Sequence, residues 1–141
     1  MKLVLDEGAT MPTRAHETDA GLDLYSRDDR VIWPTVNGCD GAVFDTGVHM
    51  EIPHGFFGKV ESKSGLNVNN GIVSCGGVID EGYTGSIAVK LYNLGTRGYA
   101  VRKGDKIAQI IIQPYAAPEL ELVDKLDETE RGDNGFGSTG K

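Results

Sequence analysis

The chain alternates between apolar and polar residues over short stretches, and such alternation predicts β-strands. In the segment 20–25, Leu22 and Leu24 fall on one side of the chain and Asp23 falls on the other. This is the pattern of a strand, in which successive side chains point to opposite faces. No apolar period of 3.6 residues persists over three helical turns. The pattern therefore predicts a protein built almost entirely of strands.

Glycine, proline and asparagine separate these stretches and favour turns between them. One short helix is predicted in the piece that begins at 62–66, where Ser62 and Ser64 offer N-cap side chains, and ends within 67–71. Many short strands in a chain with 20 glycines predict an all-β, jelly-roll-like distorted barrel with at most this one helix. The predicted strands are 2–5, 20–25, 31–34, 42–52 as one or two strands, 56–61, 72–73, 86–92, 99–101 and 106–113.

The glycine-framed segment 76–85 is the most distinctive stretch of the chain. The apolar pair 72–73 leads into it, and the alternating segment 86–92 leads out of it. This arrangement predicts a β-hairpin whose loop of several residues uses Gly82 and Gly85 for unusual backbone angles.

The same segment carries two chemically useful groups three residues apart, the carboxylate of Asp80 and the phenol of Tyr83. Gly76 and Gly77 lack a Cβ atom, so a ligand can approach the backbone near Val78. Free N–H and C=O groups there would read the edge of a planar ring. The alternative interpretation is a tight hairpin with a solvated acid.

Length and composition indicate one globular domain. The chain has 141 residues, of which 39% are hydrophobic and 25% charged, and a domain of this size buries about two-thirds of its unfolded surface. No apolar run approaches the roughly 20 residues of a membrane span. Residues 1–6 are too short and too soon charged for a signal peptide. We therefore expect a cytoplasmic protein with no membrane partner.

The net charge of −7 argues against a nucleic-acid polymer as partner, because domains that bind one usually carry a basic stripe. A small anion is compatible, since Lys59, Lys63 and Arg131 flank glycine-rich stretches. A divalent metal ion would offset the remaining charge of a phosphate. Cys39 and Cys75 have no CxxC spacing, which excludes a disulfide framework and a structural zinc site.

The composition divides the chain into a β-barrel domain, 1–123, and a polar, glycine-rich arm, 124–141, that we expect to be flexible. A frayed terminus is the simpler interpretation. The residues of this segment favour an arm that becomes ordered over a ligand. Arg131 offers a bidentate phosphate contact, Phe136 can stack on a base, and neighbouring hydroxyl groups can donate hydrogen bonds.

Five stretches with compatible spacing cover most of the chain. They are Ala20–Ser26 (AGLDLYS), Ser64–Leu66 (SGL), Gly77–Gly85 (GVIDEGYTG), Gly104–Gln109 (GDKIAQ) and Arg131–Gly140 (RGDNGFGSTG). Together they resemble the trimeric deoxyuridine triphosphate nucleotidohydrolases, the dUTPase family. The resemblance implies a jelly-roll-like β-barrel, a homotrimer with three shared active sites, and a C-terminal arm that closes over a site formed largely by neighbouring chains.

The resemblance implies hydrolysis of dUTP to dUMP and pyrophosphate, which limits uracil incorporation into DNA and supplies dUMP for thymidylate synthesis. Asp80 would orient and deprotonate the water that attacks the α-phosphorus. Gln109 would contact the phosphate or this water, and Arg131 would grip the γ-phosphate. Asp23 would reach Mg²⁺ through a bound water. Tyr83 would lie against the deoxyribose and leave no room for a 2′-hydroxyl.

The resemblance also implies a set of substrate-binding residues. One group would read uracil, a second would hold the phosphates, and a third would act from the arm by stacking on uracil or binding the γ-phosphate. The first group is Ser74, Val78, Ile79 and Ala88; the second is Lys63, Ser64 and Gly65; the third is Phe136, Ser138 and Thr139.

Four features depart from the family pattern. Lys63 stands where the family usually has arginine, so the charge is kept but the bidentate fork is lost. Leu22 replaces the commonest aromatic residue of the first motif. Asn134 replaces a glycine, a mild change because asparagine tolerates left-handed backbone. Segment 37–41 resembles a small insertion.

Two other functions are compatible with the motifs. A dCTP deaminase, or a bifunctional deaminase-hydrolase, would share the fold, although no further glutamate is clearly placed for deamination. A regulatory protein whose surface, including segment 37–41, is gated by a nucleotide is the alternative from another class. Such a role is compatible with catalysis.

Several residues are expected to be structural. His16, His49 and His54 are isolated in the sequence and are expected on the surface or in packing, rather than as ligands. Trp33 is expected in the core or at a subunit contact. Cys75 is expected to be a small buried residue.

Overall fold

The computed structural model describes residues 1–35, 41–75 and 77–134. These residues form antiparallel strands and one short helix, which confirms the all-β prediction. In this part of the chain, no helix is long and apolar enough to cross a membrane. The elements are β1 (Leu3–Leu5), β2 (Gly21–Tyr25), β3 (Arg30–Ile32), β4 (Ala42–Asp45), β5 (Val48–Met50), β6 (Phe56–Glu61), α1 (Ser64–Asn70), β7 (Ile72–Ser74), β8 (Val78–Ile79), β9 (Ala88–Asn93), β10 (Tyr99–Val101) and β11 (Lys106–Pro114).

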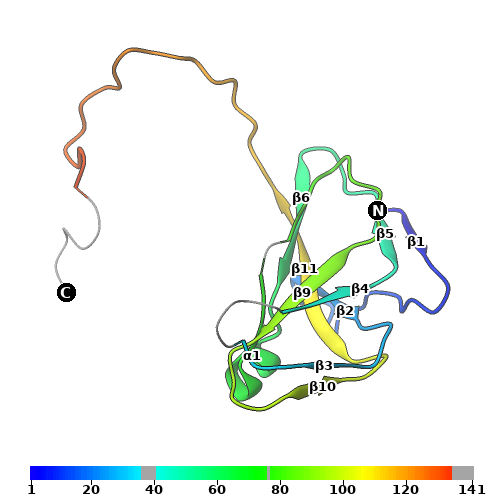
Figure 1. The fold of residues 1–141 in the computed structure, drawn as a ribbon. Helices are drawn as coiled ribbons and strands as arrows, with labels where there is room; N and C mark the ends of the chain where they lie inside the picture. Colours follow the sequence, from blue (N-terminus) through cyan, green and yellow to red (C-terminus); the bar gives the residue numbers. More distant parts are fainter. Residues whose placement is uncertain (36–40, 76, 135–141) are drawn as a thin grey trace.

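The strands form two larger sheets and two smaller pairs. The strand order is β2-β11-β6-β8 in the first sheet and β4-β9-β7 in the second. β1 pairs with β5, and β10 pairs with β3. In Figure 1 the β3–β10 pair and α1 lie at the lower end of the molecule, while β6 begins at the upper end. The strands enclose a single core.

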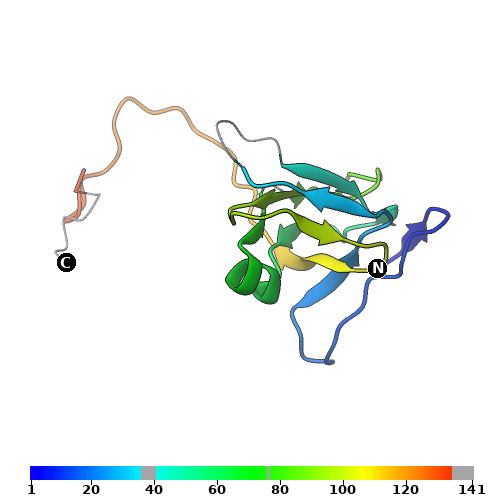
Figure 2. The ribbon, with the colours of Figure 1, turned by 60° about the horizontal axis from the view of Figure 1, so that its bottom comes forward.

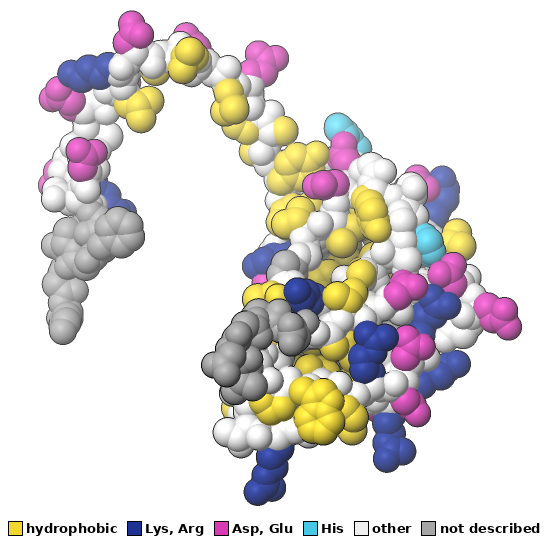
Figure 3. Space-filling model, viewed as in Figure 1, with side chains coloured by type: hydrophobic (Ala, Val, Ile, Leu, Met, Phe, Trp, Pro, Cys, Tyr) yellow, Lys and Arg dark blue, Asp and Glu magenta, His cyan; other side chains and the backbone are white. Residues whose placement is uncertain are grey.

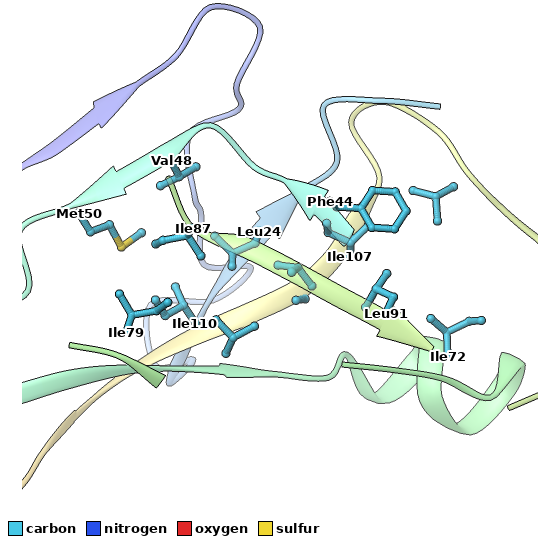
Figure 4. Close-up of a cluster of buried hydrophobic side chains, with 14 of the residues drawn as sticks. Leu24, Phe44, Val48, Met50, Ile72, Ile79, Ile87, Leu91, Ile107 and Ile110 are labelled. Atoms are coloured by element: carbon cyan, nitrogen blue, oxygen red, sulfur yellow. The ribbon is translucent and has the colours of Figure 1, made fainter. Parts of the chain in front are cut away.

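Alternation along the strands places one face of each larger sheet in this core. In β9, Val89 and Leu91 are buried while Ala88 is exposed. Leu24 and Ile110 contribute from the first sheet, and Figure 4 shows them in one cluster with Leu91 of the second sheet. Full burial of such a side chain contributes about 1.5–3 kcal/mol, so these residues determine which strands face each other.

β11 contains an irregularity that affects the position of Gln109. The register of β11 against β2 shifts between Lys106 and Ala108, as at a β-bulge, which gives one strand an extra residue. Ile107 and Ala108 are both buried although they are consecutive. After the shift, Gln109 pairs with Asp23.

The two strands of the predicted hairpin do pair, since β7 is antiparallel to β9, but the segment between them is not a simple loop. β8 pairs with β6, whereas β9 pairs with β4 and β7, so the chain passes from one sheet to the other. Positive φ occurs at Gly77 (119°) and not at Gly82 or Gly85. A Cβ atom on Gly77 would lie 2.7 Å from Val60 Cβ. Alternation identified the strands, but their partners depend on packing across the core.

The predicted helix is present as α1, and it ends where the sequence predicted. α1 begins after Lys63, its N-cap residue, which makes no side-chain capping bond. The predicted serine cap is therefore wrong. The hydroxyl oxygen of Ser62 instead accepts the N–H of Ser74 at 2.8 Å. The helix ends at Gly71, whose φ of 66° suits a glycine.

Two expectations of burial are also wrong. Trp33 is 71% exposed and so is not a core residue. Its ring lies against Gly98, where a Cβ atom would come within 2.9 Å of it. A subunit contact for Trp33 stays a prediction. Cys75 is exposed rather than buried.

Beyond β11, residues 115–134 form neither helix nor strand. Figures 1 and 2 show this segment leaving the sheets and running away from them. Leu120 and Leu122 are 96% and 100% exposed, and Figure 3 shows hydrophobic and acidic side chains along the segment. The segment adds nothing to the core of its own chain. Residues 135–141, which include Phe136, Ser138 and Thr139, lie outside the described residues.

Candidate active site

Strand β6 connects two groups of predicted site residues. Just before its first residue, the N–H of Gly55 donates to the carboxylate of Glu81 at 2.7 Å, which places the turn after β8 at that end. Its last residue leads to Lys63 and α1. In Figure 1 these two ends are the upper and lower parts of the molecule.

The turn between β8 and β9 carries Asp80 and Tyr83. The N–H of Tyr83 donates to the carbonyl of Asp80 at 3.0 Å, and the Tyr83 hydroxyl donates to the carbonyl of Ser86 at 3.0 Å. Gly85 lies under the phenol, and a Cβ atom there would overlap its hydroxyl group. Gly85 is therefore required for space rather than for an unusual φ. The turn fixes Tyr83 on the surface, where the residue is 45% exposed.

The carboxylate of Asp80 is exposed at the start of this turn. Among the described residues, it accepts no hydrogen bond and forms no ion pair. A carboxylate in this condition has all its lone pairs available for a water molecule or a substrate. Such a carboxylate is able to accept a proton from a bound water molecule.

The carboxylate of Glu81, next to Asp80, is by contrast occupied by hydrogen bonds. Besides Gly55, its carboxylate contacts His54 Nδ1 at 3.1 Å and the Tyr115 hydroxyl. The hydrogen bond from Gly55 is the main reason that the pKa of Glu81 lies below its ordinary value. Glu81 is thus an anchor that ties the turn to the start of β6 and to the first residue after β11.

At the other end of β6, Asp23 lies at the centre of a cluster of charges. Asp23 is 3% exposed; one carboxylate oxygen pairs with Lys63 Nζ, and the other lies 2.7 Å from Lys106 Nζ. Burial raises the pKa of Asp23, but hydrogen bonds from Lys106 and Lys63 outweigh burial and hold the pKa below its usual value. Asp23 therefore holds two ammonium groups side by side.

Gln109 and Ser74 belong to the same end. Gln109 Nε2 donates to the carbonyl of Ser62 at 3.1 Å, and the hydroxyls of Ser62 and Ser74 lie 3.2 Å apart. Gly21 leaves room for the Gln109 side chain, because a Cβ atom at Gly21 would overlap it. Ser64 and Gly65 are the exposed first residues of α1.

The two ends are far apart within one chain. Ile79 pairs with Gly58, so Asp80 lies near Phe57, whereas Lys63 follows the end of β6. Six residues of extended chain span about 20 Å. A nucleotide bound at Asp80 would therefore not reach Lys63 of the same chain directly.

The residues expected to read uracil are spread over different elements. Val78 is 64% exposed, whereas Ile79 is buried with 8% exposed. Ala88 pairs with Asp45 of β4 rather than facing Val78 across a hairpin. Ser74 lies at the other end of β6, beside Ser62 and Gln109.

A model of the dUTPase family matches residues 7–140. The chain belongs to the dUTPase family. A deoxyuridine 5′-triphosphate nucleotidohydrolase of Mus musculus is 45% identical over 137 residues, which are 97% of this chain and 82% of the relative. A mitochondrial enzyme of the same name from Homo sapiens is 46% identical over 97% of this chain, which spans only 53% of that relative.

Solved structures of two dUTPases confirm the fold. The dUTPase of Staphylococcus bacteriophage 80alpha with dUpNHpp is 33% identical, with a TM-score of 0.87 over 99% of this chain and 98% of that one. A point mutant of the dUTPase from phage phi11 of S. aureus is 30% identical, with a TM-score of 0.80 over 88% and 96% of the two chains. That structure is described as revealing coordination of a structural Mg(II) ion.

The described residues of this dUTPase-family chain contain no group of three or more histidine, cysteine or acidic residues that could hold a metal ion. Asp23, the predicted metal contact, already has a lysine ammonium group on each carboxylate oxygen. A second cation would be repelled unless one lysine moved away. In this arrangement Asp23 does not fit Mg²⁺, and its contact with a metal through water stays a prediction.

Sequence reasoning missed two residues that contact the predicted site residues or their turn. Glu81 lies next to Asp80 and Lys106 lies in the GDKIAQ motif, so both stood inside quoted stretches. The signal for Glu81 was its position beside the predicted base. No signal in the sequence pointed to Lys106, because it is far from Asp23 in the chain. The two residues meet only once β2 and β11 have paired.

Proposed function

We propose that this chain hydrolyses dUTP to dUMP and pyrophosphate, and so limits uracil incorporation into DNA and supplies dUMP for thymidylate synthesis. Membership of the dUTPase family supports the proposal, as do the names of relatives that match nearly the whole chain. The observation that carries it is the exposed Asp80 carboxylate, which has no partner among the described residues and stands on a turn fixed by Glu81 and Tyr83.

In this proposal Asp80 takes a proton from the water that attacks the α-phosphorus. General-base assistance of this kind contributes about 10²–10⁴-fold to a rate. Tyr83 lies against the deoxyribose and leaves no room for a 2′-hydroxyl. The backbone at Val78 and Ile79 reads uracil, with Ser74 and Ala88 nearby.

The phosphates require positive charge and donors, and the Asp23 end offers both. Lys63 turns from Asp23 to a phosphate, while the backbone at Ser64 and Gly65 donates N–H groups. Gln109 contacts the phosphate or the attacking water, and Arg131 grips the γ-phosphate together with Ser138 and Thr139. Mg²⁺, when bound to the triphosphate, would neutralise charge that builds up in the transition state.

We place the complete site between chains of a homotrimer. The separation of about 20 Å along β6 supports this placement, because one chain does not bring Asp80 and Lys63 together. Asp80 and Tyr83 would then come from one chain and the phosphate-binding residues from another. The arm, 124–141, would close over the site, with Phe136 stacking on uracil.

Release of pyrophosphate from dUTP, dTTP, dCTP and UTP in the presence of Mg²⁺ tests the activity. We expect a strong preference for dUTP. Purified protein that is inactive toward dUTP would contradict the proposal. Formation of uracil nucleotides from dCTP would instead identify a deaminase, the alternative with the same fold.

Mixed trimers test the composite site. Asp80→Asn and Lys63→Ala are each expected to be nearly inactive alone. If the two residues serve one site from different chains, co-refolding the variants in equal amounts should restore about a quarter of the sites by random assembly. No recovery in mixed trimers, measured by pyrophosphate release, would show that both residues act within one chain.

A regulatory role is the second candidate. The 80alpha structure is described with the statement that phage dUTPases control transfer of virulence genes by a proto-oncogenic G protein-like mechanism. We propose a pull-down with and without dUpNHpp, because a nucleotide-gated surface should bind its partner in only one of these conditions. Equal recovery of the same proteins in both would argue against gating.

A further inference from the structure

His49, on β5, makes side-chain contacts with two separate parts of the chain. Its Nδ1 lies 2.8 Å from the carbonyl oxygen of Thr84, and its Nε2 lies 3.2 Å from a carboxylate oxygen of Asp6. The carbonyl belongs to the residue that follows Tyr83. His49 therefore connects the turn to the loop after β1.

The contacts continue from Asp6 and return to the same turn. Arg27 Nη1 lies 3.2 Å from the second carboxylate oxygen of Asp6 and 3.1 Å from Asp45. Asp45 accepts the hydroxyl of Ser86 and the N–H of Gly47. A closed ring of polar contacts thus runs from the turn through His49, Asp6, Arg27 and Asp45 and back to Ser86. We call these four residues the histidine clasp.

The two contacts of His49 favour its protonated form. A carbonyl oxygen and an ionised carboxylate are both acceptors, and neutral imidazole has only one N–H. Both contacts are therefore hydrogen bonds only when His49 is an imidazolium. If the ring is neutral, one nitrogen lone pair faces an acceptor and one contact is lost.

The two ends of the clasp hold the residues against which Tyr83 rests. Thr84 and Ser86 flank Gly85, which lies under the phenol, and the Tyr83 hydroxyl donates to the carbonyl of Ser86. Among the described residues, the Tyr83 hydroxyl has no hydrogen-bond partner besides Ser86. Movement of this short backbone segment would therefore move the phenol.

We propose that the histidine clasp positions Tyr83 and thereby sets how strongly the site discriminates deoxyribose from ribose. This inference rests on the proposed dUTP hydrolysis. His49 is a positioning residue, because it acts through Thr84 and touches no substrate. Discrimination against a 2′-hydroxyl requires the phenol to stay within van der Waals distance of the sugar, and misplacement of about 1 Å can change a rate by 10²-fold.

The surroundings of His49 make the clasp sensitive to pH. Asp6, Asp45 and Arg27 face it, and Lys2 and Glu51, which pair with each other at 3.0 Å, line the same open groove of about 420 Å³. The hydrogen bond to the Thr84 carbonyl is the main cause that raises the pKa of His49, and Asp6 and Asp45 add to it. The clasp is complete when His49 is protonated and loses one bond as pH rises through this pKa.

The test compares kcat/KM for dUTP with kcat/KM for UTP in wild type, His49→Ala and His49→Gln. For His49→Ala we expect the ratio to fall about tenfold, with kcat/KM for dUTP changing less than the ratio. His49→Gln keeps an amide donor that does not titrate, so its ratio should be close to that of wild type and independent of pH. His16→Ala removes an exposed histidine and serves as the matched control.

The clasp is supported if the ratio of kcat/KM for dUTP to that for UTP falls in wild type as pH rises from about 5.5 to about 8.5. The same ratio should not change with pH in His49→Gln. Equal ratios in wild type and a folded His49→Ala would overturn it. If His49→Ala does not fold, the wild-type pH profile decides, and a flat profile overturns the inference. Absence of dUTP hydrolysis in wild type would instead contradict the proposed function, so the two failures are distinguishable.

Discussion

Asp23 and Asp80 are carboxylates of the same chain with opposite surroundings. Asp23 is buried and has a lysine on each oxygen, whereas Asp80 is exposed and has no partner among the described residues. A buried, doubly paired acid fixes the positions of its cations. An exposed, unpaired acid is free to accept a proton. The same side-chain chemistry can therefore organise one end of β6 and react at the other.

The difference between them also shows why an acid in a motif is not sufficient evidence of a base. Glu81 stands next to Asp80 in the sequence, yet its carboxylate is already used by Gly55 and His54. Asp45, another acid close to the turn, is used by Ser86 and Arg27. Around this turn, only Asp80 is both exposed and without such a contact among the described residues.

The largest expected effect concerns charge at the Asp23 end of β6, where we propose that the phosphates bind. Lys63 and Lys106 supply two cations there, and we expect Arg131 to add the one that grips the γ-phosphate. An arginine in comparable phosphoryl chemistry contributes about 10³–10⁵-fold. Truncation before Arg131 should lower kcat by this factor while changing dUTP binding far less, measured by single-turnover kinetics and titration. An unchanged kcat would identify the segment as a frayed terminus.

At the other end of the comparison, Asp80→Asn should lower kcat by about 10²–10⁴-fold. The amide cannot accept the proton, but it keeps the shape of the turn, so binding of dUpNHpp and the unfolding midpoint should stay close to wild type. Asp28→Asn, which neutralises an exposed acid elsewhere, is the control. Wild-type kcat in Asp80→Asn would show that another group is the base.

Asp23→Asn should affect stability more than chemistry. It removes the charge that holds Lys63 and Lys106 together and leaves two ammonium groups facing a neutral side chain. Loss of hydrogen bonds to a charged group costs about 1–3 kcal/mol, which urea unfolding would detect as a lower midpoint with an unchanged slope. An unchanged midpoint would mean that the lysines reach water without cost and that Asp23 is not an anchor.

The smallest expected effect concerns pH. It is the change, at acid pH, in the stability difference between wild type and Asp23→Asn. The pKa of Asp23 is lowered in the folded state, so its contribution to stability is present above its unfolded pKa of about 3.9 and is lost as pH falls through the folded value. The stability difference between wild type and Asp23→Asn should therefore shrink below about pH 4. A constant difference from pH 7 to pH 3 would contradict the ion-pair interpretation.

Much of the fold could be predicted from local patterns. The segments now seen as β2, β6 and β11 were predicted because alternation and apolar runs depend only on residues that are close in the chain. The helix was predicted near its true start, but its cap was not, since Ser62 bonds Ser74 of a later strand. The flanking strands of the predicted hairpin pair as β7 and β9, but the pairing of β8 with β6 between them was not predicted. Strand partners are chosen by long-range packing.

For the site, the motifs identified the acid, the phenol and the lysine, but not what surrounds them. Sequence reasoning treated His49 as an ordinary surface or packing residue. Its contacts with Asp6 and Thr84 connect three separated parts of the chain. No spacing rule finds such a group, because the residues meet only after β1 has paired with β5 and the turn has closed over them.

The sequence by itself determined the membership of the dUTPase family, the all-β class, and the presence of an acid and a phenol three residues apart in one turn. These properties reside in residue identities and short spacings. Only the tertiary structure decided that Asp23 is neutralised by two lysines, that Glu81 is an anchor and that Asp80 is free. The physical reason is that the state of a carboxylate depends on burial and on neighbouring charges, and both are set by strand pairing.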